Sequence, residues 1–529
     1  MGDQIQPVVD AGLELVEGGP EVIDGGPEVR LRNGFDAPYD DAIAAARTCY
    51  SPRVIAADEV TAGQRSRIGP LTYEGGHHTV FTHATFEFEL SGISRQLVWC
   101  FLHSFPFYNT EQQSQRYVRL DEARAHVPRV LSGEARDVYV SAIASAWRAY
   151  RELTGRLEKV TLEILSDLWR LEERQSLAFG RSVRREAEKK AIETARYVIP
   201  VACHTAMIYT VSGITLHRLR RMAAACDAPR EARQVVERMV AEVRRLDASF
   251  FDEIGEEPID PDQVVENRVG GNADDEATLE AFDKSLGGRR SRLVDYSMRG
   301  PEVVADAVRN VLGRPDLDDE AALDLVLDPA QNRYRLDTLN VSAHSPLMRA
   351  LNHAHYTFRK RISHTADSQD QRHRMVPGSR PLLARTVPDR VDVVEPEIMA
   401  ADRASHELFR ESVEESWDAR ARLLKLGVEP ELALYVLPNA LAVRFEESGS
   451  LLHLLHKWTM RTCLNAQREI YEASMDEIAE VRAVHPQLVR HVGPPCFVRS
   501  GLARPRCTEG SHFCGVPVWR SFPDIERKI

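Results

Sequence analysis

The side chains best suited to chemistry are gathered in one polar stretch, Glu111-Gln112-Gln113-Ser114-Gln115-Arg116-Tyr117, followed by Val118 and Arg119. Carboxylate, amide, hydroxyl and guanidinium groups follow one another there, with little that is apolar enough for a core. An arginine beside a serine can grip an oxyanion, because the guanidinium presents paired donors and the hydroxyl adds another. For an isolated run of this kind, the alternative is a solvated polar loop.

The polar stretch does not stand alone, because similar segments recur in the same order later in the chain. Residues 367–373 (DSQDQRH) resemble it, with Arg372 lying 256 residues after Arg116. Residues 195–200 (ARYVIP) match 433–438 (ALYVLP) at an offset of 238, and residues 212–217 (SGITLH) match 448–453 (SGSLLH). Residues 45–47 (AAR) are echoed at 307–309 (AVR). These echoes indicate an ancient duplication with two diverged halves.

Hydrophobic periodicity predicts a mixed α and β protein with helices in excess. Alternation favours strands near residues 29–32, 79–90 and 293–296. Spacing of three and four favours helices over 40–50, 93–102, 135–177, 184–246 and 301–312, and between 397 and 484. The expected organisation is a leader (1–26), repeat 1 (27–252), an acidic linker rich in Gly and Pro (253–290), repeat 2 (291–485) and a cysteine-containing tail (486–529).

Composition narrows the class of protein. A net charge of −12 argues against a general nucleic-acid surface. We expect no membrane span, because no run of about 18 apolar residues occurs. The acidic N-terminus lacks the features of a signal peptide, so we expect a cytoplasmic protein whose eight cysteines are reduced.

The tail carries the second group of residues with chemical potential. Cys496, Cys507 and Cys514 lie there, and Cys463 lies on the preceding helix. Four sulfur ligands, or three with His512, would suit structural zinc, although the spacings are not those of a CxxC knuckle. The alternative is a set of small buried thiols.

Several segments of repeat 1 resemble the flavin-dependent thymidylate synthase family, whose signature runs Arg-His-Arg, then Ser, Asn, Ser and Arg. Residues 76–83 (GHHTVFTH) resemble its GHxTxFxH segment, and Arg95-Gln96 resembles the Arg-Gln before the signature. Residues 111–118 (EQQSQRYV) resemble its nucleotide-gripping end. Between Gln96 and Ser114 the Arg-His-Arg triplet is missing and the chain is longer than the pattern.

Repeat 2 carries complementary pieces of the same resemblance. Residues 358–361 (FRKR) resemble Phe-Arg-His-Arg with Lys360 in place of His, and Arg461 precedes AQREI (466–470) as an arginine of the family's late helix precedes AQxEI. Counted from the SGxxLH landmarks, repeat 1 has Ala225 at the place of Arg461. Family sites form between subunits, one giving Arg-His-Arg and the late arginine, the other the Ser-x-Arg loop. The resemblance therefore implies one composite site per chain, the reciprocal site having decayed.

The resemblance implies an α+β fold of two tandem repeats, each a sheet flanked by long helices. It implies reductive methylation of dUMP to dTMP by a flavoprotein methyltransferase, with FAD as cofactor and NADPH and methylenetetrahydrofolate as co-substrates. The family is tetrameric, so two chains are expected to form a homodimer that is a pseudo-tetramer. Arg461 would be the catalytic residue. Substrate would contact Gln96, Glu111, Gln113, Ser114, Gln115, Arg116 and Arg359; FAD would contact His83, Thr85, Arg359, Lys360 and Arg361.

Other interpretations remain open. The substrate could be another pyrimidine nucleotide, or the chain could be an inactive nucleotide- or flavin-binding homologue. The family's flavin-contacting Asn-x-Arg is absent, with Ser212 and Ser448 at the Asn places. His83 could be a core histidine, residues 359–361 a basic surface, and Arg461 a partner of Glu469.

Overall fold

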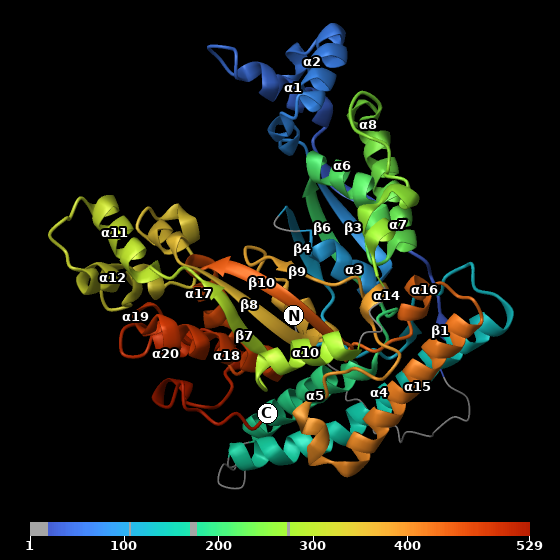
Figure 1. The fold of residues 1–529 in the computed structure, drawn as a ribbon, viewed down its shortest axis with the longest axis vertical. Coiled ribbons are helices and arrows are strands. Elements are labelled where there is room, and N and C mark those ends of the chain that lie inside the picture. The colour runs from blue at the N-terminus through green and yellow to red at the C-terminus, as the bar shows by residue number, and fades with distance from the viewer. Residues whose placement is uncertain (1–19, 105–106, 170–176, 272–275) are drawn as a thin grey trace, which may run out of the picture.

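The computed structural model describes residues 20–104, 107–169, 177–271 and 276–529, which are organised by two four-stranded sheets (Figure 1). The first has the order β2 (Glu28–Gly34), β3 (Thr85–Ser94), β6 (His204–Ser212) and β4 (Tyr108–Gln112). The second has the order β7 (Ser291–Tyr296), β8 (His355–Ser363), β10 (Ala442–Ser450) and β9 (Gly378–Ser379). All pairing within them is antiparallel. Position for position, the two sheets share one topology, as a tandem duplication requires.

The strands differ from the predicted ones at two places. The strand expected over 79–90 is instead a 3-10 helix, η2 (His78–Thr82), followed by β3. The blocks 184–246 and 397–484, expected to be helical, each contain a strand, β6 and β10. Both strands bury alternate side chains, and this period of two was obscured by the helical spacing on either side.

Matching helices follow matching strands. The Ser94 hydroxyl caps α3 (Arg95–Leu102) by accepting from Leu97 N at 2.9 Å, and the Ser363 hydroxyl caps α13 (His364–Asp370) by accepting from Ala366 N at 3.1 Å. After β6 come α6 (Gly213–Met222) and α7 (Pro229–Leu246); after β10 come α17 (Leu451–Arg461) and α18 (Arg468–Val484). Outlying pairs are α1 (Pro38–Thr48) with α2 (Ala62–Glu74) and α11 (Gly300–Leu312) with α12 (Asp319–Leu327), which project at separate corners of Figure 1.

The repeats meet across a local twofold relation. Val201 N donates to Leu437 O at 2.8 Å, and Asn439 N donates to Ile199 O at 2.8 Å. Residues 201 and 439 are equivalent, as are 199 and 437, because each pair is separated by 238 residues. Each of the two bonds is therefore the counterpart of the other, with donor and acceptor repeats interchanged. The backbone of one repeat therefore pairs with the equivalent backbone of the other, as two subunits of a dimer would.

Two buried glutamates strengthen this junction reciprocally. Glu231 of α7 accepts from Tyr435 Oη of repeat 2 at 2.6 Å and from Ser94 N at 2.7 Å. Glu469 of α18 accepts from Tyr197 Oη of repeat 1 at 2.5 Å and from Ser363 N at 2.5 Å. Each repeat thus supplies the tyrosine that satisfies the other repeat's carboxylate, which ties the caps of α3 and α13 to the junction.

Apolar packing joins the repeats below the sheets. Trp147 of α4 (Gly133–Leu168) lies in one buried cluster with Phe409 and Val413 of α15 (Arg403–Lys425). These helices run side by side, with α5 (Leu177–Ala195) next to α4 (Figure 1). A core shared by both halves stabilises them as one unit by burying apolar surface.

The remaining segments are partly ordered against the repeats. Of the expected leader, residues 1–19 lie outside the described residues, and β1 (Val22–Ile23) pairs with β5 (Ala123–Arg124). The expected linker contains η6 (Pro261–Gln263), α9 (Val265–Val269) and α10 (Glu276–Leu286). The tail holds short helices only: α19 (Pro486–Val489), α20 (Pro495–Val498), η11 (Gly510–His512) and η12 (Val518–Arg520).

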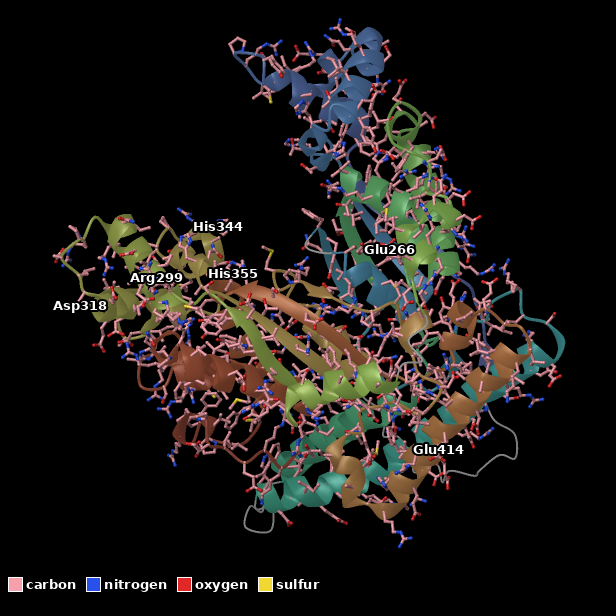
Figure 2. All side chains as sticks on the ribbon, in the orientation of Figure 1. Glu266, Arg299, Asp318, His344, His355 and Glu414 are labelled. Carbon is pink, nitrogen blue, oxygen red and sulfur yellow. The ribbon has the colours of Figure 1, made fainter. Side chains whose placement is uncertain are left out.

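Repeat 2 reaches across the molecule. Figure 2 shows Asp318, at the start of α12, and Glu414, on α15, on opposite sides. Across the described ranges, we find no helix with the length and apolar character needed to cross a bilayer.

Candidate functional site

The polar stretch of repeat 1 ends against repeat 2. Glu111 lies on β4, and the guanidinium of Arg116 donates from Nη2 to the backbone oxygen of Asn465 at 2.6 Å. The Nε of Arg116 pairs with Glu193 of α5. Arg116 therefore contacts the connection between α17 and α18 of repeat 2, while Glu193 of its own repeat neutralises its charge.

The other residues of the stretch divide into buried and exposed groups. Gln115 is buried, with Nε2 3.5 Å from Cys203 Sγ and Oε1 accepting from Asn439 Nδ2 at 3.2 Å, so this amide belongs to the repeat junction. Gln113 is exposed, and its backbone N donates to Ala206 O at 2.9 Å. Ser114 is half-buried and accepts from Arg116 N at 3.3 Å, which leaves its hydroxyl proton available to a ligand.

Arg461, the last residue of α17, approaches the same junction. Its Nε donates to His373 Nε2 at 2.9 Å, and its Nη2 donates to Gln369 O at 2.7 Å. Both acceptors are uncharged, and within the described part of the chain no carboxylate forms an ion pair with this guanidinium. Since Nε2 of His373 accepts a hydrogen bond, its imidazole is neutral, with the proton on Nδ1.

Electrostatics make Arg461 a site for an anion. Burial lowers the pKa of Arg461 to about 10; Asp370 opposes this lowering, and the charges of Arg116 and Arg372 add to it. Arg461 is half-buried. A cation that loses part of its hydration without gaining a carboxylate partner is costly, and an anionic ligand would relieve that cost.

The loop after α13 completes the junction, and sequence reasoning missed its role. Arg372 Nη2 lies 3.0 Å from Glu111 Oε1, and Arg374 Nη1 donates to Asn109 Oδ1 at 2.7 Å, both across the repeats. A cleft is lined here by Tyr108, Asn109, Thr110 and Glu111 of repeat 1 and by Arg372 and Arg374 of repeat 2, among others. The sequence could have pointed to this loop, because residues 372–374 read Arg-His-Arg, the triplet that is missing from repeat 1.

A buried ionic cluster fixes this loop from behind. Lys360 of β8 bonds Asp370 of α13 at 2.6 Å, Glu447 of β10 at 2.9 Å and Glu477 of α18 at 2.9 Å, and Lys457 of α17 joins the same carboxylates. The two ammonium groups hold the pKa of Asp370 well below its usual range despite burial, whereas burial and Asp370 raise that of Glu447. The cluster links Asp370, at the end of α13, to β8, β10, α17 and α18. It therefore fixes the position of the backbone from which the loop of residues 372–374 starts.

The cations of β8 lie away from the junction residues. Arg359 Nε bonds Glu446 at 2.9 Å, and its guanidinium stacks over Phe282 of α10 at 4.9 Å. Arg361 pairs with Asp392 at 2.9 Å, and Lys360 belongs to the buried cluster. The structure therefore does not bring residues 359–361 together with Arg461 and Arg116, because alternate side chains leave β8 on opposite faces and each finds its own carboxylate.

Three further candidates of repeat 1 lie elsewhere. His83 and Thr85 are exposed, one closing η2 and the other beginning β3. Gln96 is fully buried; its Nε2 donates to Asp227 at 3.1 Å, and its Oε1 is 3.1 Å from His364 Nε2. Gln96 therefore faces the reciprocal junction rather than Arg461.

The reciprocal junction lacks both arginines. Both ends of β6 and β10, and the residues Ser212 and Ser450 at the N-cap positions of α6 and α17, differ by 238. The counterpart of Arg461 is therefore Ala223, not Ala225. Glu111 of β4 pairs with Ile208 of β6, and Ser379 of β9 pairs with Glu446, the counterpart of Ile208 in β10. Glu111 and Ser379 are therefore equivalent. Counting five residues on from each shows that Ala384 is the counterpart of Arg116. Ala384 N donates at 3.0 Å to Asp227, the counterpart of Asn465. At the reciprocal junction, alanines therefore stand at the counterparts of both Arg461 and Arg116.

The sulfur candidates also gather. Cys496, Cys507 and Cys514 contact one small core cluster together with Leu464, the neighbour of Cys463. In the described ranges, no group of three or more Cys, His, Asp or Glu side chains is arranged to hold a metal ion, so the predicted set of zinc ligands is not found there.

Comparisons with known proteins bear on both repeats. The family model described as thymidylate synthase complementing protein matches residues 31–247 and 292–487. A flavin-dependent thymidylate synthase of Clostridium tetani (strain Massachusetts / E88) is 30% identical over 213 residues, 39% of this chain and 78% of the relative. The flavin-dependent thymidylate synthase of Saccharolobus solfataricus is 29% identical, over 40% of this chain and 80% of the relative. That of Sulfolobus acidocaldarius is 27% identical, over 43% of this chain and 91% of the relative. The two matched segments cover the two sheets except for the first residues of β2 and β7.

Proposed function

Since this chain belongs to the thymidylate synthase complementing protein family, we propose that it binds dUMP at the junction of its repeats and methylates it to dTMP. The observation that carries the proposal is the half-buried guanidinium of Arg461, which has uncharged acceptors at 2.9 and 2.7 Å. Negative charge that develops on a uracil ring would be stabilised by this preorganised cation.

The phosphate of dUMP would be held by Ser114 and Arg372. The Ser114 hydroxyl has a proton to donate. Among the described residues, Arg372 is paired only with Glu111, whose side chain is 80% exposed, and such surface pairs are worth at most about 1 kcal/mol. Arg372 can therefore exchange this carboxylate for a phosphate, whereas Arg116 keeps Glu193 and positions the loop.

The family name implies FAD, and the residues of the cleft fit a phosphate-bearing cofactor better than those of β8. Arg372 and Arg374 line the cleft, whereas residues 359–361 are neutralised by Glu446, Asp370, Glu447, Glu477 and Asp392. Arg374 would hold the FAD diphosphate. When bound, FAD supplies the redox chemistry, with NADPH and methylenetetrahydrofolate as co-substrates.

A nucleotide-binding homologue without catalysis is the second candidate. It is favoured by the start of α17, where Ser448, Gly449 and Ser450 stand in place of the Asn-x-Arg expected from the family resemblance. Ser448 Oγ bonds Thr357 Oγ1 at 2.9 Å and Ser450 Oγ bonds His453 Nδ1 at 2.9 Å, so neither position offers a cation to a flavin.

Visible absorption of the purified full chain, with and without added FAD and dUMP, separates the two candidates. We expect a bound-flavin spectrum that dUMP perturbs, because both ligands would lie at the repeat junction. Protein that binds dUMP but takes up no FAD would support the non-catalytic homologue. Protein that binds neither would contradict both.

A further inference from the structure

Two arginines from outside repeat 2 hold the connection between α17 and α18. Arg116 of repeat 1 donates from Nη2 to Asn465 O at 2.6 Å. Arg527 of the tail donates from Nη2 to Leu464 O at 3.2 Å and to Ala466 O at 2.6 Å. Three consecutive carbonyl oxygens are therefore bound by two guanidinium groups, and the backbone that follows α17 is fixed from two sides.

Arg527 binds these carbonyls as a buried cation. It is 8% exposed, and its guanidinium lies over the ring of Tyr471 of α18 at 4.9 Å. Its Nε donates to Ile529 O at 2.7 Å, which leaves Nη2 to the connection. Burial lowers the pKa of Arg527 to about 10, and Glu193 opposes this lowering. The group is therefore charged at neutral pH, and charge-assisted hydrogen bonds are roughly twice as strong as those between neutral groups.

The segment that carries Arg527 is anchored on repeat 1. Trp169, at the end of α4, donates from Nε1 to Cys514 O at 3.1 Å. Gly515 has φ +80°, and a Cβ there would lie 2.5 Å from the same nitrogen, so this turn requires glycine. Ile529 packs against the apolar cluster that α4 and α5 form together. The tail therefore bridges the repeats, because it rests on two helices of repeat 1 and donates to the connection of repeat 2.

The reciprocal junction has no such clamp. The offset of 238 makes residues 226–228 the counterparts of residues 464–466. Within the described part of the chain, no arginine donates to the carbonyl oxygens of residues 226–228; the carboxylate of Asp227 accepts from Leu383 N at 2.6 Å instead. The family model matches residues only up to 487, before most of the tail. A segment outside the matched ranges therefore holds the junction that keeps Arg461.

We infer that Arg527 is a positioning residue for the nucleotide site, acting on Arg461 through the connection; this role rests on the proposed function. Arg461 is the last residue of α17, and its Nη2 donates to Gln369 O at 2.7 Å. At the other end of the connection, Gln467 Oε1 accepts from the side-chain amide of the same Gln369. Holding the connection therefore holds Arg461 along the backbone and through Gln369, as a precise binding site requires.

Calorimetric titration of the full chain with dUMP tests this role. We expect Arg527→Met to bind dUMP about 10-fold more weakly than the unaltered chain, because the side chain still covers Tyr471 but loses its donors. Arg527→Lys, which keeps the charge, should recover part of the affinity. Arg520→Ala removes an exposed guanidinium from η12 of the same tail and should bind dUMP within about twofold of the unaltered chain.

A double variant separates positioning from a general loss of stability. If Arg527 acts through Arg461, the double variant Arg461→Ala/Arg527→Met should bind dUMP within about twofold of Arg461→Ala alone. A general loss of stability would instead weaken binding equally in both backgrounds. Equal affinity of Arg527→Met and the unaltered chain, or the full loss on the Arg461→Ala background, would overturn the inference.

Hydrogen–deuterium exchange provides a measurement that does not depend on dUMP. The backbone amides of residues 463–467 should exchange faster in Arg527→Met than in the unaltered chain, and at an unchanged rate in Arg520→Ala. Unchanged exchange in Arg527→Met would overturn the clamp. If the unaltered chain binds no dUMP although exchange rises as expected, the proposed function fails, and the positioning role with it, while the clamp stands. Should Arg527→Met not fold, Arg527→Gln, which keeps one donor group, should show a smaller loss in both measurements, and no loss would overturn the inference.

Discussion

Replacing Arg461 with alanine is expected to weaken dUMP binding by about 100-fold or more, which corresponds to about 3 kcal/mol. The guanidinium is half-buried, and charge-assisted hydrogen bonds to a bound anion are among the strongest polar contacts. The free protein should not be destabilised by the loss of this charge, because Arg461 is a half-buried cation without a carboxylate partner in the described chain. Isothermal titration calorimetry with dUMP, paired with thermal unfolding, measures both effects.

A matched control separates the local role of Arg461 from net charge. Arg403 of α15 also carries a guanidinium, but its side chain is 91% exposed, and within the described ranges it pairs only with Glu407. Arg403→Ala should leave dUMP affinity within about twofold, since exposed pairs contribute little. Equal affinity for the two variants would show that Arg461 does not contact the nucleotide.

The Lys360→Met variant should lose about 3–5 kcal/mol of folding free energy. Lys360 is 1% exposed and satisfies carboxylates from α13, β10 and α18, so its removal leaves three buried acids with one ammonium group, that of Lys457. Because the pKa of Asp370 is depressed, the contribution of this pair is present above about pH 4 and is lost only as the pH falls further. Urea unfolding at pH 7 is therefore the appropriate measurement.

The adjacent residue provides the control for Lys360→Met. Arg359 leaves β8 on the other face, is 33% exposed and pairs with the partly exposed Glu446. Arg359→Met should cost no more than about 1 kcal/mol. If the two variants unfold at the same urea concentration, the buried cluster does not hold α13 as inferred. Should Lys360→Met not fold at all, Asp370→Asn, which removes a single charge from the cluster, provides a milder test of the same loss.

The sequence predicted the duplication and most helices because these depend on local periodicity and on repeated motifs. The prediction missed β6 and β10 for a local reason. Each strand has only nine residues and lies between helical segments, so its alternation of buried and exposed side chains covers too short a stretch to stand out. The register of the late helices was wrong by two residues. The SGxxLH landmark aligns Ser212 with Ser448, whereas the caps of α6 and α17 align Ser212 with Ser450.

The candidate site was predicted in part. Arg116 and Arg461, both named from the family resemblance, lie at the same repeat junction, where the charge of Arg116 acts on that of Arg461. Three of the four cysteines named as metal ligands share one small cluster. The literal Arg-His-Arg at 372–374 was passed over because residues 367–373 were matched to the polar stretch of repeat 1. In the structure residues 367–370 lie on α13, whose counterpart is α3, while the stretch itself belongs to β4 and the following loop. Only strand pairing, a long-range property, distinguishes these alternatives.

The stoichiometry of dUMP binding tests most directly the claim that each chain contains one composite site. Equilibrium dialysis or calorimetry at saturating dUMP should give one nucleotide per 529-residue chain, because Ala223 and Ala384 replace Arg461 and Arg116 at the reciprocal junction. Two nucleotides per chain would show that the reciprocal junction still binds and would contradict the assignment of a single site.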